Sequence, residues 1–376
     1  MSVVYKKLEE VCEILDSQRV PITAKDRKSG VYPYYGANGL QDHVSDYIFD
    51  DELVLLAEDG GNFGSKDRPI AYRVSGKCWV NNHAHVLKAK SDIHIDYLCY
   101  ALMFYNTDGL VNGATRQKLT QAAMRQMVIP YRCMKEQEQI VDEISRVFHL
   151  IAVRNEELDL LEQLVKSRFI ELFGDVIHNS KAWQMRLFAD IASSRLGKML
   201  DAKQQTGKCS YPYLANFNVQ WFRFNIENLN QMDFDEDDRA EFELKDGDLL
   251  VCEGGEIGRC AVWHNEIQPC FFQKALHRVR CNRQIIQPDY LAWWFKYNCD
   301  HDGFAAIAGA KATIAHLPGV KLKQLQVAVP PIELQQQFAA FVEQTDKSKF
   351  FACQTLSFSL KLANNLQSWR EKQYDY

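Results

Sequence analysis

The chain carries one series of sequence motifs twice, with about 195 residues between the copies. Residues 59–64 read DGGNFG and residues 253–258 read EGGEIG, and a DYL triplet follows at 96–98 and again at 289–291. The last matches pair GA at 113–114 with GA at 309–310, and MVIP at 127–130 with VAVP at 327–330. Solenoid repeats run only about 20 to 50 residues, so a period this long indicates a duplicated domain.

Each copy combines short apolar strands, glycine-rich turns and an aromatic helix. Strands are expected at residues 52–56, 70–74 and 85–89 in the first copy, and at 248–252, 260–263 and 276–280 in the second. In both copies the Gly-Gly pair closes the first of these strands and turns the chain into the second. Aromatic-rich segments at 97–106 and 290–297 predict helices. Each copy is therefore expected to be a mixed α+β domain.

A long segment with helical periodicity ends each copy. Residues 134–172 contain no Gly or Pro, and their apolar side chains recur at intervals of three and four. About 38 residues at 1.5 Å each give a helix roughly 57 Å long, and Gly174 is a natural stop. A similar pattern follows Pro331. Because neither helix could stand alone, the two are expected to pair as an antiparallel coiled coil.

These patterns predict an α+β architecture, with two α/β heads related by a pseudo-two-fold axis and joined by the two long helices. The expected boundaries are 1–130 for the first head, 131–175 for a central helical spacer, 176–330 for the second head and 331–376 for a C-terminal spacer. Heads held at a fixed separation suit a duplex that presents half-sites about a turn apart.

Composition limits the class of protein. The chain has 44 Lys+Arg, 49 Asp+Glu and a net charge of -5, which argues against a generally basic nucleic-acid coat but leaves room for a local basic groove. Residues 131–175 carry 6 basic and 10 acidic residues, so most of the excess acidity lies on the first long helix.

The sequence shows no secretory or membrane segment. The start lacks the apolar core of a secretory signal, and the chain contains no run of 18 apolar residues, the length needed to span a membrane. The 11 irregularly spaced cysteines indicate reduced thiols of a cytosolic protein rather than a zinc site at residues 252–281.

The turns GGNFG and GGEIG, together with the exits GATRQKLT and GAKATIAHL before the long helices, resemble the specificity subunit of type I restriction-modification systems. The resemblance covers essentially the whole chain. It implies two target recognition domains, each contacting one half of a bipartite asymmetric DNA target, and helices that set the gap and dock two methyltransferase subunits. It also implies restriction subunits as further partners, a role in DNA modification and phage defence, and S-adenosylmethionine, ATP and Mg on partner subunits, with no cofactor on this chain.

The motifs of a DNA-modifying or ATP-driven enzyme are missing. The only Pro-Pro pair, at 330–331, lacks the polar and aromatic neighbours of an amino-methyltransferase motif, and no G-x-x-x-x-G-K-[ST] loop occurs. The acidic run 233–238 could bind a cation or form a solvated loop. We therefore expect no catalysis and no metal. The alternatives are a nuclease or methyltransferase with a divergent motif, and an adaptor that holds two protein partners without touching DNA.

Candidate DNA contacts in the first head are polar and basic residues near the turns. They are Tyr34, Tyr35, Asn38, Asn62, Lys66, Arg68, Asn81, Asn82, His83, Thr115, Arg116, Gln117 and Lys118. Amide and basic side chains can reach base edges, whereas residues 115–118, at an expected helix start, suit a phosphate. Packed tyrosines, satisfied loop amides, a core His85 and a solvated hairpin tip are the competing interpretations.

The second head offers a different set around matching positions. Its candidates are Tyr213, Asn216, Asn218, Gln220, Arg223, Glu256, Arg259, Gln273, Lys274, His277 and Lys311. The alternation of Asn and aromatic residues in YLANFNVQWFRF suits either a base-reading segment or an ordinary amphipathic strand. Glu256 is informative, because a glutamate can accept a hydrogen bond from cytosine N4.

Overall fold

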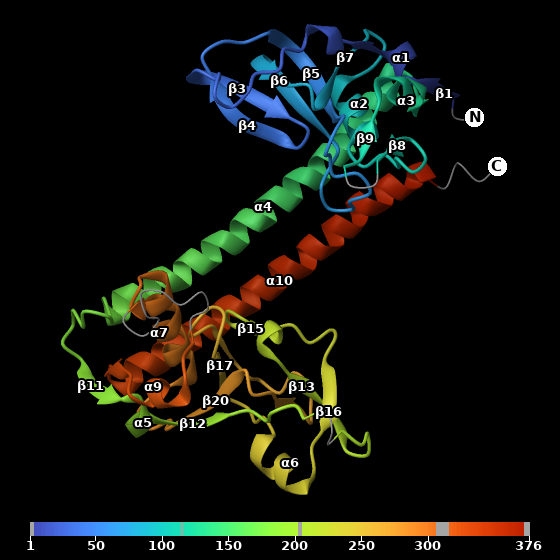
Figure 1. The fold of residues 1–376 in the computed structure, drawn as a ribbon. Helices are drawn as coiled ribbons and strands as arrows, with labels where there is room; N and C mark the ends of the chain where they lie inside the picture. Colours follow the sequence, from blue (N-terminus) through green and yellow to red (C-terminus); the bar gives the residue numbers. More distant parts are fainter. Residues whose placement is uncertain (1–3, 114–115, 202–204, 306–315, 372–376) are drawn as a thin grey trace. The chain divides into compact units, whose positions relative to one another are not determined.

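A computed structural model describes residues 4–113, 116–201, 205–305 and 316–371 of the chain, with side chains described as far as residue 359 (Figure 1). The chain divides into two compact units. One contains residues 1–154 with 355–376, and the other contains residues 155–354. No helix in the described part of the chain is both long and apolar enough to cross a membrane.

The first unit is built around one mixed sheet of six strands, in the order β2-β7-β5-β6-β3-β4. Its elements are β1 (Val4–Lys7), α1 (Leu8–Val11), β2 (Cys12–Ile14), β3 (Ser29–Gly36), β4 (Gly39–Val44), β5 (Phe49–Ala57), β6 (Ala71–Val80), β7 (Ala84–Ala89), α2 (Ile95–Leu102), β8 (Val111–Asn112), β9 (Lys118–Leu119), α3 (Gln121–Gln126) and β10 (Val128–Tyr131). The expected strand 52–56 falls within β5, the strand 70–74 overlaps β6, and the strand 85–89 falls within β7. β5 pairs with β6 as predicted.

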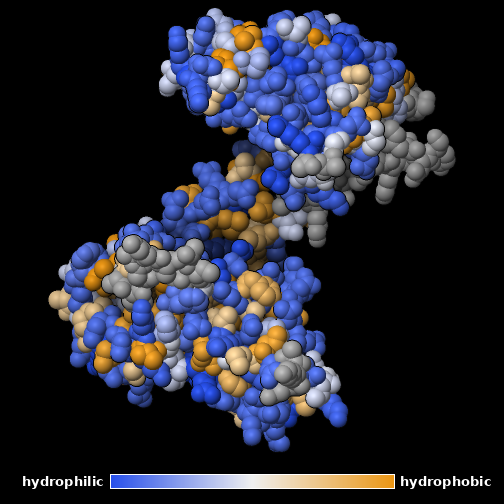
Figure 2. All heavy atoms as spheres, viewed as in Figure 1, coloured by the Kyte–Doolittle hydropathy of each residue, from blue (hydrophilic) through white to orange (hydrophobic). Residues whose placement is uncertain are grey.

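Strand β5 is buried on both faces, which explains its continuous apolar run. Side chains alternate between the faces of a strand, and here Val54 and Leu56 join one core while Leu53 and Leu55 join another. All four are 0% exposed. By contrast, hydrophilic residues dominate the face of the unit drawn at the top of Figure 2. From Leu53 to its end at Ala57 the strand is therefore a scaffold element, and the polar residues Glu58 and Asp59 follow it directly.

The second unit repeats this plan with its sheet divided. Its elements are β11 (Gln184–Leu187), α5 (Phe188–Ile191), β12 (Ala192–Leu196), β13 (Ser210–Leu214), β14 (Val219–Gln220), β15 (Arg223–Phe224), β16 (Asn230–Asp233), α6 (Glu236–Phe242), β17 (Leu249–Cys252), β18 (Cys260–Val262), β19 (Phe271–Phe272), β20 (Leu276–Cys281), α7 (Pro288–Asp300), α9 (Gly319–Lys323) and β21 (Gln326–Val329). The sheets have the orders β12-β20-β17-β18 and β16-β13-β19. In β17, Leu249 and Val251 face one core and Leu250 and Cys252 the other, as in β5.

The long segments form the expected helices, α4 (Met134–Phe173) and α10 (Ile332–Glu371), each of 40 residues. Gly174, with φ of 72°, ends α4, and its N–H bonds the carbonyl oxygen of Ile170 at 2.8 Å. In the second unit the two helices pack through aromatic rings, because the centroid of Phe338 lies 5.5 Å from that of Phe169 and 5.4 Å from that of Phe173. This unit contains the last part of α4 and the first part of α10, as an antiparallel pair requires.

The duplication is visible in equivalent strand registers, but the sequence alignment at 127–130 was wrong by two residues. β1 pairs with β10 so that Lys7 faces Val128, and β11 pairs with β21 so that Leu187 faces Gln326. Residues 128–131 are therefore equivalent to 326–329. The error arose because both segments alternate apolar side chains, and a shift by two leaves the same face inward.

Candidate nucleic-acid interface

Several candidates from separate segments of the first head meet at the turn after β5. The Asn38 side-chain Nδ2 donates to the Gly60 carbonyl oxygen at 3.0 Å, and the Gly60 N–H donates to the Gln117 carbonyl oxygen at 3.1 Å. Arg116 forms an ion pair with Asp59 and is 60% exposed. Gly60 has a backbone φ of 68°, a conformation that residues other than glycine rarely adopt. The predicted residues Asn38, Arg116 and Gln117 thus form one surface with Gly60, which we call the first rim.

The link between β6 and β7 completes the first rim. β7 begins at Ala84, which pairs with Ala57 at the end of β5, so the link lies beside the turn. The Nδ1 atom of His83 is 3.3 Å from a carboxylate oxygen of Asp59. Asn82 is exposed, whereas Asn81 is only 3% exposed. His83 and Asn82 therefore belong to the rim, and Asn81 lies beneath it.

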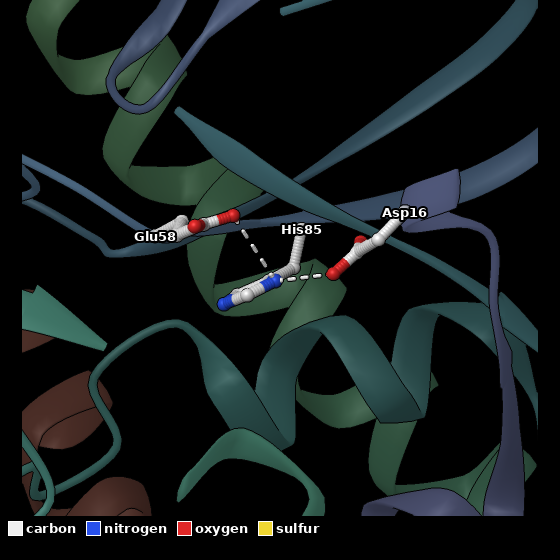
Figure 3. Close-up of side chains that lie close together, drawn as sticks. All are labelled: Asp16, Glu58 and His85. Carbon is white, nitrogen blue, oxygen red and sulfur yellow. Dashed lines mark hydrogen bonds and ion pairs between the residues drawn. The ribbon is translucent and has the colours of Figure 1, made fainter. Parts of the chain in front are cut away.

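A buried cluster of Asp16, Glu58 and His85 lies under the first rim (Figure 3). The His85 Nδ1 atom is 2.7 Å from Oδ2 of Asp16, which also accepts from Gln121 Nε2 at 2.9 Å, while Oδ1 accepts from the Val86 N–H at 2.9 Å. Burial alone would raise the pKa of Asp16, but these hydrogen bonds hold it below its usual value. Asp16 is thus a charged acceptor for three groups from two separate segments, β7 and the start of α3.

Two cationic side chains already neutralise the carboxylates of this cluster. Arg19 Nη1 bonds Glu58 at 2.7 Å, and Lys118 Nζ lies 3.1 Å from the other oxygen of Glu58. Burial opposes ionisation of Glu58, yet these contacts lower its pKa. The cluster is the one group in the described part of the chain that brings three potential metal ligands within 4.8 Å. Its acceptors are occupied by protein donors, so it works as a clamp, in which His85 Nε2 also holds the Leu119 carbonyl oxygen at 2.9 Å.

The remaining first-head candidates divide between packed and exposed positions. Tyr34 is 1% exposed and its hydroxyl donates to the Ile22 carbonyl oxygen at 3.2 Å, while the ring of Tyr35 packs 5.9 Å from that of Tyr72. Both tyrosines therefore serve the core, which was the competing interpretation. Asn62 is half-buried; Lys66, Arg68, Gln117 and Lys118 are exposed; Thr115 lies outside the described residues.

The second head holds its turn with the same hydrogen bond. Asn216 Nδ2 donates to the Gly254 carbonyl oxygen at 3.0 Å, just as Asn38 does to Gly60. Arg259 Nη2 adds two bonds, to the carbonyl oxygen and to Oδ1 of Asn216, each at 3.1 Å. We call this surface the second rim. Its exposed acid, Glu256, accepts a bond from the indole N–H of Trp221 at 2.7 Å.

Other second-head candidates are interior or outside the rim. Tyr213 is 5% exposed, and Asn218, at 1%, is occupied by the Ala215 N–H and the Asn225 carbonyl oxygen, both at 2.9 Å. His277, at 1%, contacts the Leu317 carbonyl oxygen at 2.9 Å, and burial lowers the pKa of its imidazole. Arg223 and Lys274 are exposed; Gln220 and Gln273 are half-buried; Lys311 lies outside the described residues.

Sequence reasoning found Asn38, Asn216 and Arg259 but missed other residues that hold the rims. Arg19 and Asp16 lie in a short segment without a recognisable motif, and Trp221 was hidden in an aromatic stretch. The only usable signal was the shared Asn, at 38 and 216, placed before each Gly-Gly turn.

A family model described as the type I restriction modification DNA specificity domain matches residues 2–163 and 180–352, which together make up most of the chain. The chain belongs to this family. It is a DNA specificity subunit of a type I restriction-modification system, and the specificity-subunit family is non-catalytic. The expectation drawn from the duplicated turns and exits is therefore confirmed.

Known proteins extend this similarity over the whole subunit. A Haemophilus influenzae protein assigned as a type I restriction enzyme specificity subunit is 25% identical over 346 residues, which are 90% of this chain and 86% of that protein. The crystal structure of the S subunit from M. genitalium has a TM-score of 0.63 at 12% identity, over 97% of this chain and 95% of that one. A structure from work on assembly and conformational transition of the type I system has a TM-score of 0.57 at 14% identity and 97% coverage of both chains. These structures support the mixed α+β fold of this specificity subunit.

Proposed function

We propose that this specificity subunit directs its complex to a bipartite, asymmetric target in double-stranded DNA, with one half contacted by each head. The observation that carries the proposal is the repeated hydrogen bond from Asn38 to Gly60 and from Asn216 to Gly254, which fixes two equivalent turns. Around these turns the exposed side chains differ, as two separate specificities require. The heads are residues 1–130 and 176–330.

The DNA contacts belong to the exposed and half-buried candidates on the two rims and beside them. In the first head they are Asn38, Asn62, Lys66, Arg68, Asn82, His83, Arg116, Gln117 and Lys118, and in the second Asn216, Gln220, Arg223, Glu256, Arg259, Gln273 and Lys274. Basic side chains among them suit phosphates and amides suit base edges. Thr115 and Lys311 remain candidates on sequence grounds alone.

The spacers, residues 131–175 and 331–376, set the gap and dock two methyltransferase subunits. The acidic balance of 131–175 makes this segment a poor partner for DNA and a suitable one for basic protein surfaces. Restriction subunits complete the cytoplasmic complex. S-adenosylmethionine, ATP and Mg act on those partner subunits.

Methylome sequencing tests this division of labour. A strain carrying the subunit and its methyltransferase should show one bipartite motif. Insertion of one helical turn near Asp159, matched by one turn in the facing part of α10, should lengthen the gap and leave both halves unchanged. Altered half-site bases would contradict the proposal. Binding without any sequence preference in a gel-shift of the subunit–methyltransferase complex would favour the adaptor alternative.

A further inference from the structure

The two turns present different third residues, Asn62 in the first rim and Glu256 in the second. We propose that Glu256 is a specificity-determining residue, which accepts a hydrogen bond from the exocyclic amino group of one base in the half-site contacted by the second head. This inference rests on the proposed function and adds the class of base. The chemistry is shared by cytosine N4 and adenine N6.

The two turns begin at equivalent residues and then differ. The Leu119 N–H donates to the Glu58 carbonyl oxygen at 2.8 Å, and the Leu317 N–H donates to that of Glu253 at 2.7 Å, so Glu58 corresponds to Glu253, where the sequence alignment had placed Asp59. The next contacts agree, because Asp59 bridges Lys118 and Gly254 bridges His316. The first turn rejoins its sheet at Ala71, opposite Leu56, whereas the shorter second turn rejoins at Cys260, opposite Val251. Glu256 therefore stands in a turn that the first head does not reproduce residue by residue.

The carboxylate of Glu256 is held in one orientation and remains available. Oε1 accepts from Trp221 Nε1 at 2.7 Å, and Oε2 lies 3.7 Å from Arg259 Nη1. Trp221 is itself fixed, since its ring lies 5.8 Å from that of Phe222 and beneath Lys296 Nζ at 5.1 Å. The Glu256 side chain is nevertheless 49% exposed. Two carboxylate oxygens have about four acceptor positions, so sites remain for a ligand donor.

Charge decides which part of DNA such a residue can face. An acid beside a phosphate would be repelled, so an oriented glutamate on a DNA-contacting surface suits a base edge. In the major groove only cytosine and adenine offer an amino donor, whereas guanine and thymine present acceptors. Asn62 differs because its amide both donates and accepts, and one N–H is directed at the Pro69 carbonyl oxygen at 3.4 Å. The two turns should therefore favour different bases.

The test uses the full subunit assembled with its methyltransferase subunits on a DNA library randomised over both half-sites, with methylation as the readout. Glu256→Gln keeps an oxygen for Trp221 but replaces an acceptor with a donor. We expect discrimination at one cytosine or adenine position of one half-site to fall about tenfold or more, with the other half unchanged. The identity of that base distinguishes cytosine N4 from adenine N6. Glu227→Gln, at another exposed acid of the same head, is the matched control and should leave the target unchanged.

Two results separate this inference from the function on which it rests. If the unmodified complex methylated DNA without any bipartite preference, the proposed function would fail. If the unmodified complex had a clear target and Glu256→Gln and Glu256→Ala both kept it, only the assignment of Glu256 would be overturned. Loss of all methylation by assembled Glu256→Gln complexes would also count against a single-base role.

Discussion

The two heads fix their turns in the same way and differ in the charge beneath them. In the first head, His85 contacts Asp16 through Nδ1 and the Leu119 carbonyl oxygen through Nε2. In the second, the one hydrogen bond of the His277 ring to a described residue is the equivalent bond, to the Leu317 carbonyl oxygen, and burial lowers the pKa of the imidazole. Duplication has therefore preserved the backbone contact while the side-chain network that supports it has changed. A scaffold bond of this kind tolerates divergence around it, which allows one fold to carry two specificities.

The largest expected difference between the heads concerns their contact with the long helices. Three residues after the buried glutamines Gln137 and Gln335, the first helix carries Ile140, which is half-buried, and the second carries Phe338, which is 0% exposed. Phe338→Ala should lower the local unfolding free energy of the second unit by about 3–5 kcal/mol, because it opens a cavity among aromatic rings. Ile140→Ala should cost the first unit only about 1 kcal/mol. Hydrogen exchange by mass spectrometry measures both units in one sample, and equal losses would contradict the comparison.

A smaller loss of stability, of equal size in the two heads, is expected where the heads make the same contacts. Gln137 Nε2 donates to the carbonyl oxygens of Asp92 and Arg132, and Gln335 makes the same pair of bonds to Ile285 and Pro330. Alanine at either glutamine leaves buried backbone groups unpaired and should cost about 2–3 kcal/mol in its own unit.

The control for the glutamine pair is the neighbouring exposed Gln336, whose replacement by alanine should stay within about 0.5 kcal/mol of the unmodified protein. Urea unfolding followed through exchange-labelled peptides of each unit provides the measurement. If one glutamine variant lowered the unfolding free energy of its unit and the other did not, Gln137 and Gln335 would not be equivalent.

The hydrogen bonds from Asn38 and Asn216 to their turns should differ slightly in their contribution to stability. Asn38→Ala removes one bond to Gly60 and should destabilise the first turn by about 1 kcal/mol. Asn216→Ala should cost more, about 2 kcal/mol, because Arg259 also loses its bond to the amide oxygen. Exchange rates of the peptides containing each turn test this order, and a larger effect at Asn38 would reverse it.

The smallest effect is a pH dependence confined to the second head. The folded pKa of His277 is lowered, so the unfolded chain binds the proton first, and stability should fall as pH drops from about 6.5 towards the folded pKa. The lowered pKa of Asp16 works in another window, because its contribution is present above about 3.9 and is lost as pH falls through the folded value. Urea midpoints of the second unit between pH 7 and 5 should therefore decline, and His277→Gln should flatten the decline.

The sequence predicted the elements well because strand and helix periodicities are local. The runs around Leu53 and Leu249 and the long helix before Gly174 were visible without tertiary information. The burial of polar side chains could not be predicted, since nothing local distinguishes buried Asn218 from Asn216, which holds the second turn. The correspondence of Glu58, rather than Asp59, to Glu253 was likewise invisible, because both turns read as acid-Gly-Gly.

Each long helix is divided between the two units, and this affects the order in which the units can fold. The first unit contains residues 1–154 but also residues 355–376, which leave the ribosome after every residue of the second unit. Domains usually fold in the order of synthesis, at about 5–20 residues per second. Here the first head must wait until residues beyond 354 have been made to gain its part of α10, so a chain that stops near residue 354 would leave the head made first, and not the second head, incomplete.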